Sequence, residues 1–310
     1  MPKLSIVVPA YNEEETLELF VDEVNKQTIN LPLKKTFYFI NDGSTDETLK
    51  VLKKLAVSEN IKYLSFSRNF GKEAALLAGL KASDGDFVTV MDADLQDPPE
   101  MLNEMYAKIL EGYDVVGTRR ISRDGEPPIR SFFAKTFYKL INKISDTEMV
   151  DGARDFRLMT RQVVDSILEL EEHNRFSKGL FSWVGFDTTY LAYENRERVA
   201  GTTSWNFWGL VKYSVDGIVN FSEAPLNIAT FLGFLSFLAS LIMGAFYFIR
   251  TLLWGDPVAG FPSMIIIILL LGGLQLLSLG ILGKYMAKIF LETKKRPNYI
   301  IKEGNIKNSD

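Results

Sequence analysis

Two aspartates and a glutamine at the end of an apolar segment point most directly to chemistry in this chain. Asp92, Asp94 and Gln96 alternate with other residues directly after the run Phe87–Met91. Carboxylate and amide oxygens suit Mg²⁺ or Mn²⁺ shared with a diphosphate better than they suit Zn²⁺. The apolar run predicts a buried strand of a parallel sheet, and such sheets bind ligands at the carboxyl ends of their strands. A polar turn with solvated acids is the alternative interpretation of this pattern.

An arginine pair follows the next predicted strand, Asp114–Gly117. Arg119 and Arg120 are suited to bind phosphate oxygens, because a guanidinium group donates two parallel hydrogen bonds. A solvated loop is the alternative here. The lone His173 has no neighbours that indicate a metal site or a nucleophile.

The elements that must position these residues alternate between strand and helix. Short apolar runs predict strands at residues 4–8, 37–40, 61–66 and 87–91, and helical periodicity predicts helices at 13–27, after a cap at Ser44 or Thr45, and at 72–83. This alternation predicts an α/β fold with a mostly parallel sheet that is covered by helices.

Two long uncharged segments near the C-terminus predict transmembrane helices. Ile228–Ile249 and Met264–Gly283 each approach the roughly 20 apolar residues that cross a bilayer. A pair of buried helices in a soluble core is the alternative. Cations crowd the far end of the second segment: Lys284, Lys288, Lys294, Lys295 and Arg296. By the positive-inside rule we expect this end, and with two spans also the N-terminus, on the cytoplasmic side of the cell membrane.

Two segments ahead of these spans have the pattern of helices that lie on a membrane surface. Arg130–Ser145 and Trp205–Phe221 combine apolar residues at helical spacing with interleaved cations or with Trp and Tyr. Ordinary amphipathic helices packed on the sheet are the alternative. The polar segment Asn298–Asp310 predicts a loose tail.

Composition excludes several classes of protein. The chain has 310 residues, of which 47% are hydrophobic, so it can bury a full core. A net charge of -4 argues against a general nucleic-acid binder, and the lack of Cys excludes disulfides and thiolate catalysis. The N-terminus lacks the long apolar core of a signal peptide.

Four ordered motifs carry a resemblance to a known family. They are Pro9–Glu13, Asn41–Asp46, Ser67–Lys72 and Asp92–Pro99. In this order they resemble the motifs of family 2 glycosyltransferases, and with the two C-terminal spans the chain looks like the polyprenyl-phosphate branch of that family. The resemblance implies a GT-A (Rossmann-like) catalytic domain over residues 1–204, an interfacial helix over 205–226, a transmembrane region over 227–290 and a tail over 291–310.

The resemblance also implies roles for residues at matching positions. Those assigned to the nucleotide-sugar donor are Pro9, Tyr11, Glu13, Asp42, Lys72, Asp92 and Asp94. It places Asp92, Asp94 and Gln96 around the metal and diphosphate. We expect Asp94, as a metal ligand, and Arg119, as a phosphate-binding residue, to act in catalysis. Asp42 and Glu13 have plain alternatives, since Asp favours turns before Gly and Glu favours helix starts.

Arg130 and Arg198 resemble the arginines that bind the acceptor phosphate in the family. Arg198 precedes Gly201–Trp205, where relatives often carry Gly-Glu-Ser-Lys, so the contacts of this loop are open.

The implied reaction is an inverting, metal-dependent transfer of one sugar from a UDP- or GDP-sugar to polyprenyl phosphate. A phosphate monoester has a second pKa near 6, so the acceptor is largely deprotonated at neutral pH and needs no dedicated base. We therefore expect Asp155 to orient the acceptor; it could equally be a salt-bridge partner of Arg154 or Arg157. UDP-glucose is the first expectation for the donor, ahead of UDP-GlcNAc and GDP-mannose. Room remains for a homo-oligomer.

Two competing functions are a polysaccharide synthase and a catalytically silent membrane adaptor. Processive synthases usually carry Gln-x-x-Arg-Trp, and the corresponding stretch here is Asn174–Lys178. The residues that argue against a silent adaptor are Asp92, Asp94, Gln96, Arg119 and Arg198, all of which are intact. Turnover of a sugar nucleotide separates the transferase from the adaptor.

Overall fold

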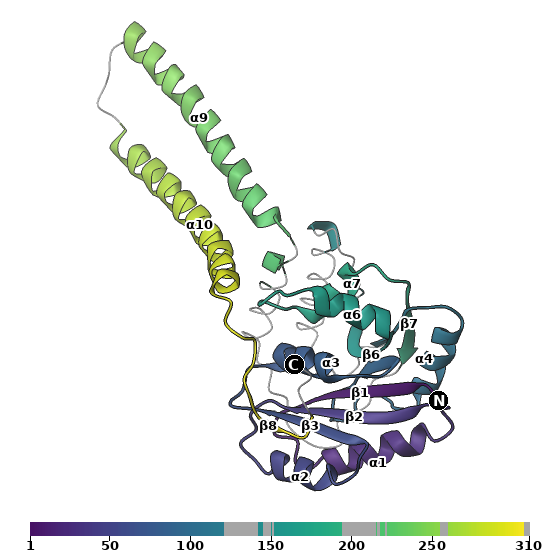
Figure 1. Ribbon diagram of the computed structural model, residues 1–310. Coiled ribbons are helices and arrows are strands. Elements are labelled where there is room, and N and C mark those ends of the chain that lie inside the picture. Colours follow the sequence, from purple (N-terminus) through teal and green to yellow (C-terminus); the bar gives the residue numbers. More distant parts are fainter. Residues whose placement is uncertain are drawn as a thin grey trace.

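An eight-stranded sheet organises the α/β part of the chain in the computed structural model, which describes residues 1–120, 142–144, 150, 152–193, 215, 218–220, 222–254 and 260–306. The strand order is β7-β5-β6-β4-β1-β2-β3-β8 (Figure 1). The strands are β1 (Lys3–Ala10), β2 (Lys34–Asn41), β3 (Ile61–Phe66), β4 (Phe87–Val90), β5 (Val115–Arg120), β6 (Ala153–Thr160), β7 (Thr188–Tyr193) and β8 (Ile301–Gly304).

Most neighbouring strands run parallel, as the alternation of strands and helices predicts. The pairs β1–β2, β1–β4, β2–β3 and β5–β7 are parallel, whereas β6 is antiparallel to β4 and β5, and β8 is antiparallel to β3. The predicted mostly parallel α/β sheet is therefore confirmed. The reversed direction of β6 matters for the site, because it brings the beginning of β6 to the carboxyl ends of its neighbours.

Helices cover both faces of the sheet. They are α1 (Leu17–Gln27), α2 (Thr48–Leu55), α3 (Lys72–Ala82), α4 (Met101–Leu110), α6 (Arg161–Glu169) and α7 (Ser177–Trp183). Successive strand residues point to opposite faces, so Ile6 and Val8 pack in the core with α1 and α4, while Val7 packs in the core with α3 and α6. Figure 1 shows α1 and α2 on one side of the sheet and α3, α6 and α7 on the other.

The first helix begins later than its periodicity predicts. We expected a helix from Glu13, but α1 begins at Leu17. The backbone N–H groups of Asn12, Glu13 and Glu14 instead donate to side chains of residues 44–48, at 3.0, 2.9 and 3.4 Å. The expected cap of the next helix is wrong for a related reason, because Ser44 accepts from Asn12, and the Asp46 carboxylate accepts from the N–H of Thr48.

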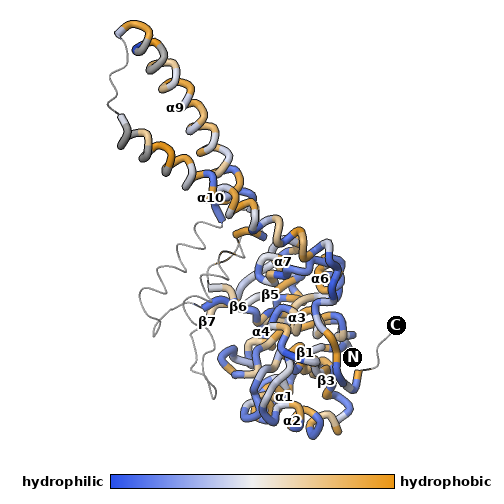
Figure 2. The backbone as a smooth tube through the Cα atoms, turned by 90° about the vertical axis from the view of Figure 1, so that its left-hand side faces the viewer, coloured by the Kyte–Doolittle hydropathy of each residue, from blue (hydrophilic) through white to orange (hydrophobic). Residues whose placement is uncertain are grey.

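Two long apolar helices project from the α/β part of the chain, in the positions where transmembrane spans are predicted. They are α9 (Ala224–Trp254) and α10 (Phe261–Lys294), with 31 and 34 residues (Figure 2). By length and composition both can cross a membrane. Their hydroxyl groups suit that setting: Thr230, Ser240 and Ser278 each donate to a carbonyl of their own helix, so they require no water.

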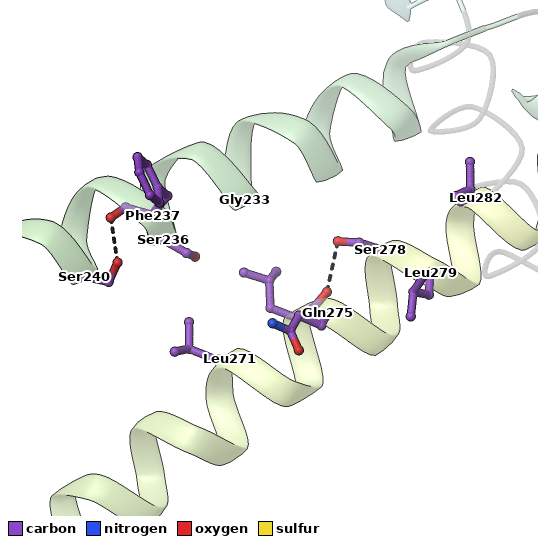
Figure 3. A pocket seen from close by; sticks show the side chains of 10 residues that line it. Gly233, Ser236, Phe237, Ser240, Leu271, Gln275, Ser278, Leu279 and Leu282 are labelled. Atoms are coloured by element: carbon purple, nitrogen blue, oxygen red, sulfur yellow. Dashed lines mark hydrogen bonds between the residues drawn. The ribbon is translucent and has the colours of Figure 1, made fainter.

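A groove separates these two helices along part of their length. Figure 3 shows that its lining comes from both helices: Gly233, Ser236, Phe237 and Ser240 from α9, and Leu271, Leu274, Gln275, Ser278, Leu279 and Leu282 from α10. The groove contains none of the predicted site residues.

The end of α10 and the segment after it contact the α/β part of the chain. Glu292 accepts from the backbone N–H groups of His173 and Asn174, at 2.9 and 3.2 Å. The Tyr299 ring stacks on Phe66, with ring centroids 4.9 Å apart, and β8 then pairs with β3. The expectation of a loose tail is wrong for residues 298–306, because Tyr299 and Ile301 supply apolar contacts for a new edge strand.

The two predicted surface helices, Arg130–Ser145 and Trp205–Phe221, lie outside the described residues except for positions 142–144, 215 and 218–220.

Candidate functional site

The predicted site residues gather where the parallel strands end. The carboxyl ends of β1, β2, β3, β4, β5 and β7 meet along one edge of the sheet, and the start of β6 joins them because β6 runs the other way. The four motifs follow β1, β2, β3 and β4, so they lie in a row across the sheet in the strand order β4, β1, β2 and β3. We treat this edge in two halves, the β1–β3 half and the β5–β7 half, with β4 at their junction.

On the β1–β3 half, the first two motifs are tied to each other. The Asn12 side chain accepts from the N–H of Thr45 at 2.9 Å, and the Asn12 N–H donates to Ser44. Asn12 adopts a left-handed conformation with a φ of 56°, a region that Asn tolerates better than most residues. Pro9 lies next to the last residue of β1, beside Ile40 of β2, and the carboxylate of Glu13 accepts from the Thr16 hydroxyl at 2.8 Å.

Asp42 connects this half to the third motif. Its two carboxylate oxygens accept from the N–H groups of Phe70 and Gly71, at 2.6 and 2.9 Å. Burial raises the pKa of Asp42, and the two N–H donors oppose that rise. The neighbouring Gly43 has a φ of 65°, and a Cβ there would lie 2.2 Å from the carbonyl carbon of Arg68. Asp42 thus fixes the loop that leads into α3.

At the junction, Lys72 bridges two carboxylates. Its ammonium lies 2.7 Å from Asp92 Oδ1, 2.9 Å from Asp92 Oδ2 and 2.6 Å from Asp155 Oδ2. The β4–β6 register pairs Val90 with Arg157, so the two aspartates, each two residues farther toward this edge, come close together. The alternative of an ion pair between Asp155 and Arg154 or Arg157 is therefore replaced by a pair with Lys72.

The charges of this bridge reinforce one another. Burial opposes ionisation of Asp155, but the positive charges of Lys72 and then Lys178 outweigh this effect and hold the pKa of Asp155 far below its usual range. In the same way, the two carboxylates outweigh burial and raise the pKa of Lys72. Lys72 and Asp155 are therefore both charged across the neutral pH range.

The other two predicted metal ligands lie toward the β5–β7 half. Asp94 is buried, at 5% exposure, and its Oδ1 accepts from the Gln96 N–H at 3.1 Å. The Gln96 side-chain oxygen faces two guanidinium groups, those of Arg120 and Arg154, each at 3.4 Å.

A buried carboxylate that the sequence analysis passed over holds Arg154 in place. Asp97 is 1% exposed, and its Oδ1 accepts from the Tyr193 hydroxyl at 2.5 Å and from Arg154 Nε at 3.3 Å. Burial raises the pKa of Asp97, and the guanidinium of Arg154 opposes this rise. Asp97 lies within the Asp92–Pro99 motif, and Arg154 lies within the segment Asp151–Arg157. No local sequence pattern indicates that these two side chains contact each other.

The remaining predicted residues are distributed differently. Arg119 is exposed and lies opposite Ala153, whereas the guanidinium group of Arg120 faces the Gln96 side-chain oxygen. Tyr11 is 44% exposed in the turn after β1. Arg130 and Arg198 lie outside the described residues.

The donor atoms at the junction fit a hard divalent cation that is shared with a substrate. Among the described residues no three His, Cys, Asp or Glu side chains form a ready metal site. Two carboxylates and an amide nevertheless match Mg²⁺ or Mn²⁺, which commonly take one or two carboxylates plus phosphate oxygens. The ammonium at Asp92 indicates that this position attracts a cation.

Comparison with known proteins shows which family this sequence matches. Residues 5–168 match the family described as "Glycosyl transferase family 2". A putative glycosyltransferase of Bacillus subtilis (strain 168), CsbB, is 46% identical over 308 residues, which cover 99% of this chain and 93% of that protein. A bactoprenol glucosyl transferase of Shigella phage SfX is 44% identical over 301 residues, covering 97% of this chain and 99% of the relative.

Among solved structures, mannosyl-3-phosphoglycerate synthase from Rubrobacter xylanophilus has a TM-score of 0.48 and 20% identity, covering 70% of this chain and 72% of that one.

Proposed function

The chain belongs to glycosyl transferase family 2, and on that premise we propose that it transfers one sugar from a nucleotide-sugar to polyprenyl phosphate. The products would be a polyprenyl-phosphate sugar, with inverted configuration at the transferred carbon, and a nucleoside diphosphate. Nearly full-length similarity to bactoprenol glucosyl transferases supports this acceptor and makes UDP-glucose the first donor to test.

The observation that carries the proposal is the row of charged groups at the carboxyl edge, in a chain that also has two bilayer-length helices. Lys72 contacts the Asp92 carboxylate at the junction, and Arg120 and Arg154 face the nearby Gln96 side-chain oxygen, so the edge offers both a cation site and cations for phosphate oxygens. The contact between Glu292 and the 173–174 loop joins the second apolar helix to the same domain. With these helices in a membrane, the domain would lie within reach of both a soluble sugar nucleotide and a lipid acceptor.

Each group has a distinct part in the proposed reaction. The Pro9–Glu13 turn and the loop held by Asp42 would receive the nucleotide, as the family motifs imply. A divalent cation held by Asp92 and Asp94, with Gln96 beside them, would offset the charge that develops on the departing diphosphate. Arg120 and Arg154 would orient phosphate oxygens, because their guanidinium groups are already fixed by Gln96 and Asp97.

Asp155 is suited to orientation rather than to proton removal. A carboxylate whose pKa is held low by Lys72 is a weak base. The lipid phosphate has largely lost its second proton at neutral pH and carries its own nucleophilic charge. The transfer therefore needs no general base, and Asp155 would fix Lys72 and the acceptor side of the junction.

The proposed topology has the catalytic domain and both termini in the cytoplasm. Lys284, Lys288, Lys294 and Lys295 lie on or just after the end of α10 that joins the domain, which agrees with the positive-inside rule. The proposed domains are those predicted from the sequence, residues 1–204, 205–226, 227–290 and 291–310, with part of the last contributing β8.

A direct test supplies the purified full-length protein with undecaprenyl phosphate and a panel of UDP- and GDP-sugars, with and without a chelator. We expect lipid-linked sugar from UDP-glucose, and its loss in the chelator. If no donor yields a lipid-linked sugar, the proposed transfer is wrong; product from another donor would correct the sugar alone.

A further inference from the structure

Positive side chains contact two of the three predicted metal ligands. Lys72 approaches both oxygens of Asp92, at 2.7 and 2.9 Å, and the guanidinium groups of Arg120 and Arg154 face the Gln96 oxygen. A divalent ion entering alone would meet these cations at short range. The carboxylates attract the ion, but part of their charge is already neutralised.

The Lys72 bridge is a built feature of the fold. Lys72 is the first residue of α3, and the preceding loop is held by Asp42 through the N–H groups of Phe70 and Gly71. The next residue, Glu73, accepts from the backbone N–H of Ser177 at 3.0 Å and from its hydroxyl, which anchors the same turn to α7. The backbone at Lys72 is therefore held from both sides, and its ammonium reaches the point where Asp92 and Asp155 converge.

We propose that Lys72 occupies Asp92 until the donor arrives, so that the divalent cation enters together with the nucleotide diphosphate and does not bind on its own. This inference deepens the proposed function and rests on it. The diphosphate supplies the negative charge that lets a divalent cation and Lys72 share the junction, because each can then face phosphate oxygens as well as carboxylates. Loss of the nucleotide product restores the repulsion and favours departure of the metal with it.

The test measures Mn²⁺ binding without donor or acceptor. Full-length protein in detergent is titrated with Mn²⁺, and the free ion is followed by its electron paramagnetic resonance signal. We expect weak binding by the wild type and at least tenfold tighter binding by Lys72→Met, because both Asp92 oxygens are released.

Three further variants make the comparison specific. Lys72→Arg keeps a cation at the junction, and we expect its Mn²⁺ affinity to stay near that of the wild type. Lys178→Met removes a charge that acts on Asp155 without occupying Asp92, and we expect no tightening. Adding Asp92→Asn to Lys72→Met should return the affinity to the weak wild-type level.

The proposal fails if Lys72→Met is folded, as judged by thermal unfolding, and binds Mn²⁺ no more tightly than the wild type. Lys72→Gln, which stays neutral but can still hydrogen-bond to the carboxylates, carries the same expectation should the Met variant not fold. Because neither substrate is present, this result is independent of the donor panel above. Failure of sugar transfer would overturn the proposed function and leave the metal comparison readable.

Discussion

Asp94 is the most deeply buried of the three predicted metal ligands, and its neutral variant separates ligand chemistry from fold. Asn has nearly the same shape as Asp, so the contact with the Gln96 N–H can persist in Asp94→Asn. We expect transfer to fall about 100-fold or more, as when one electrostatic contact to a transition state is removed. Initial rates of lipid-linked sugar formation against Mn²⁺ concentration measure this.

Asp86→Asn is the matched control for this prediction. Asp86 lies at the opposite end of β4 and accepts from the N–H of Lys3. We expect its rate to stay within about twofold of the wild type, since it is far from the carboxyl edge. Full activity in Asp94→Asn would remove Asp94 from the metal site.

The Lys72–Asp155 pair also predicts a particular dependence of stability on pH. The lowered pKa of Asp155 stabilises the fold above the usual Asp value near 4, and this stabilisation is lost as pH falls toward the folded pKa. The raised pKa of Lys72 stabilises below the usual Lys value of about 10.4, and this is lost only at higher pH.

The difference in thermal unfolding midpoint between the wild type and Asp155→Asn should therefore be constant from about pH 5 to 9 and should shrink below about pH 4. Differential scanning fluorimetry across this range measures it. A step in the difference near pH 7 would contradict the assignment of a permanently charged pair.

The residue types predicted where the candidate site lies, but they did not predict which of its residues contact one another. The oxygen-rich Asp92–Gln96 segment and the Asp42 turn are local patterns, and both lie at the expected edge. The bridge from Lys72 to Asp155 joins residues 83 positions apart, and Asp97 meets Arg154 and Tyr193 across 57 and 96 positions. Such pairs depend on strand register, which no local pattern specifies.

At the scale of elements, the loops between strands and helices determine the shape of the β1–β3 half. Gly43 is the tightest point, because its φ is positive and a side chain there would collide with the backbone of Arg68. We expect Gly43→Ala to displace the loop that ends at Gly71 and to weaken nucleotide binding at least tenfold, in addition to a backbone cost of about 1–2 kcal/mol.

Gly112→Ala isolates the backbone cost. Gly112 also has a positive φ, of 112°, but no atom lies within 4 Å of the added Cβ. We expect this variant to lose stability without losing affinity for UDP, measured by isothermal titration calorimetry. Equal affinities in the two variants would mean that the Arg68 loop does not shape the donor site.

Element boundaries were predictable where periodicity alone sets them. Strands β1 to β4 and helix α3 follow their apolar patterns closely. Helix α1 starts late because side chains from the next motif take up the N–H groups of residues 12–14, and β8 was missed because four residues with alternating burial give little signal. In both cases a distant partner, and no local preference, determines the structure.

At the scale of the whole molecule, β8 links the two long apolar helices to the edge of the sheet. The N–H of Tyr63 donates to the Asn305 side chain at 2.7 Å, and the N–H of Ser67 donates to the carbonyl of Ile300 at 2.9 Å. A stop after Asn298 removes these acceptors and the Tyr299 ring. We expect at least about tenfold faster hydrogen exchange in the peptide that covers residues 61–67.

A stop after Ile306 is the control for this truncation, because it leaves β8 and Asn305 in place. Exchange in the same peptide should then match that of the full chain, as measured by mass spectrometry. Unchanged protection in the shorter variant would show that β3 does not depend on β8.

The pairing of β3 with β8 also has a consequence for how the protein is made. The ribosome delivers β3 early and β8 last, after both apolar helices, so β3 must wait with an open edge throughout synthesis. If both helices cross the bilayer, β8 returns to the side on which β3 waits; if only one crosses, β8 is left on the other side. Closure of the sheet therefore excludes a chain in which only one helix has crossed, because such a chain keeps β8 away from β3 and leaves the edge of β3 unpaired.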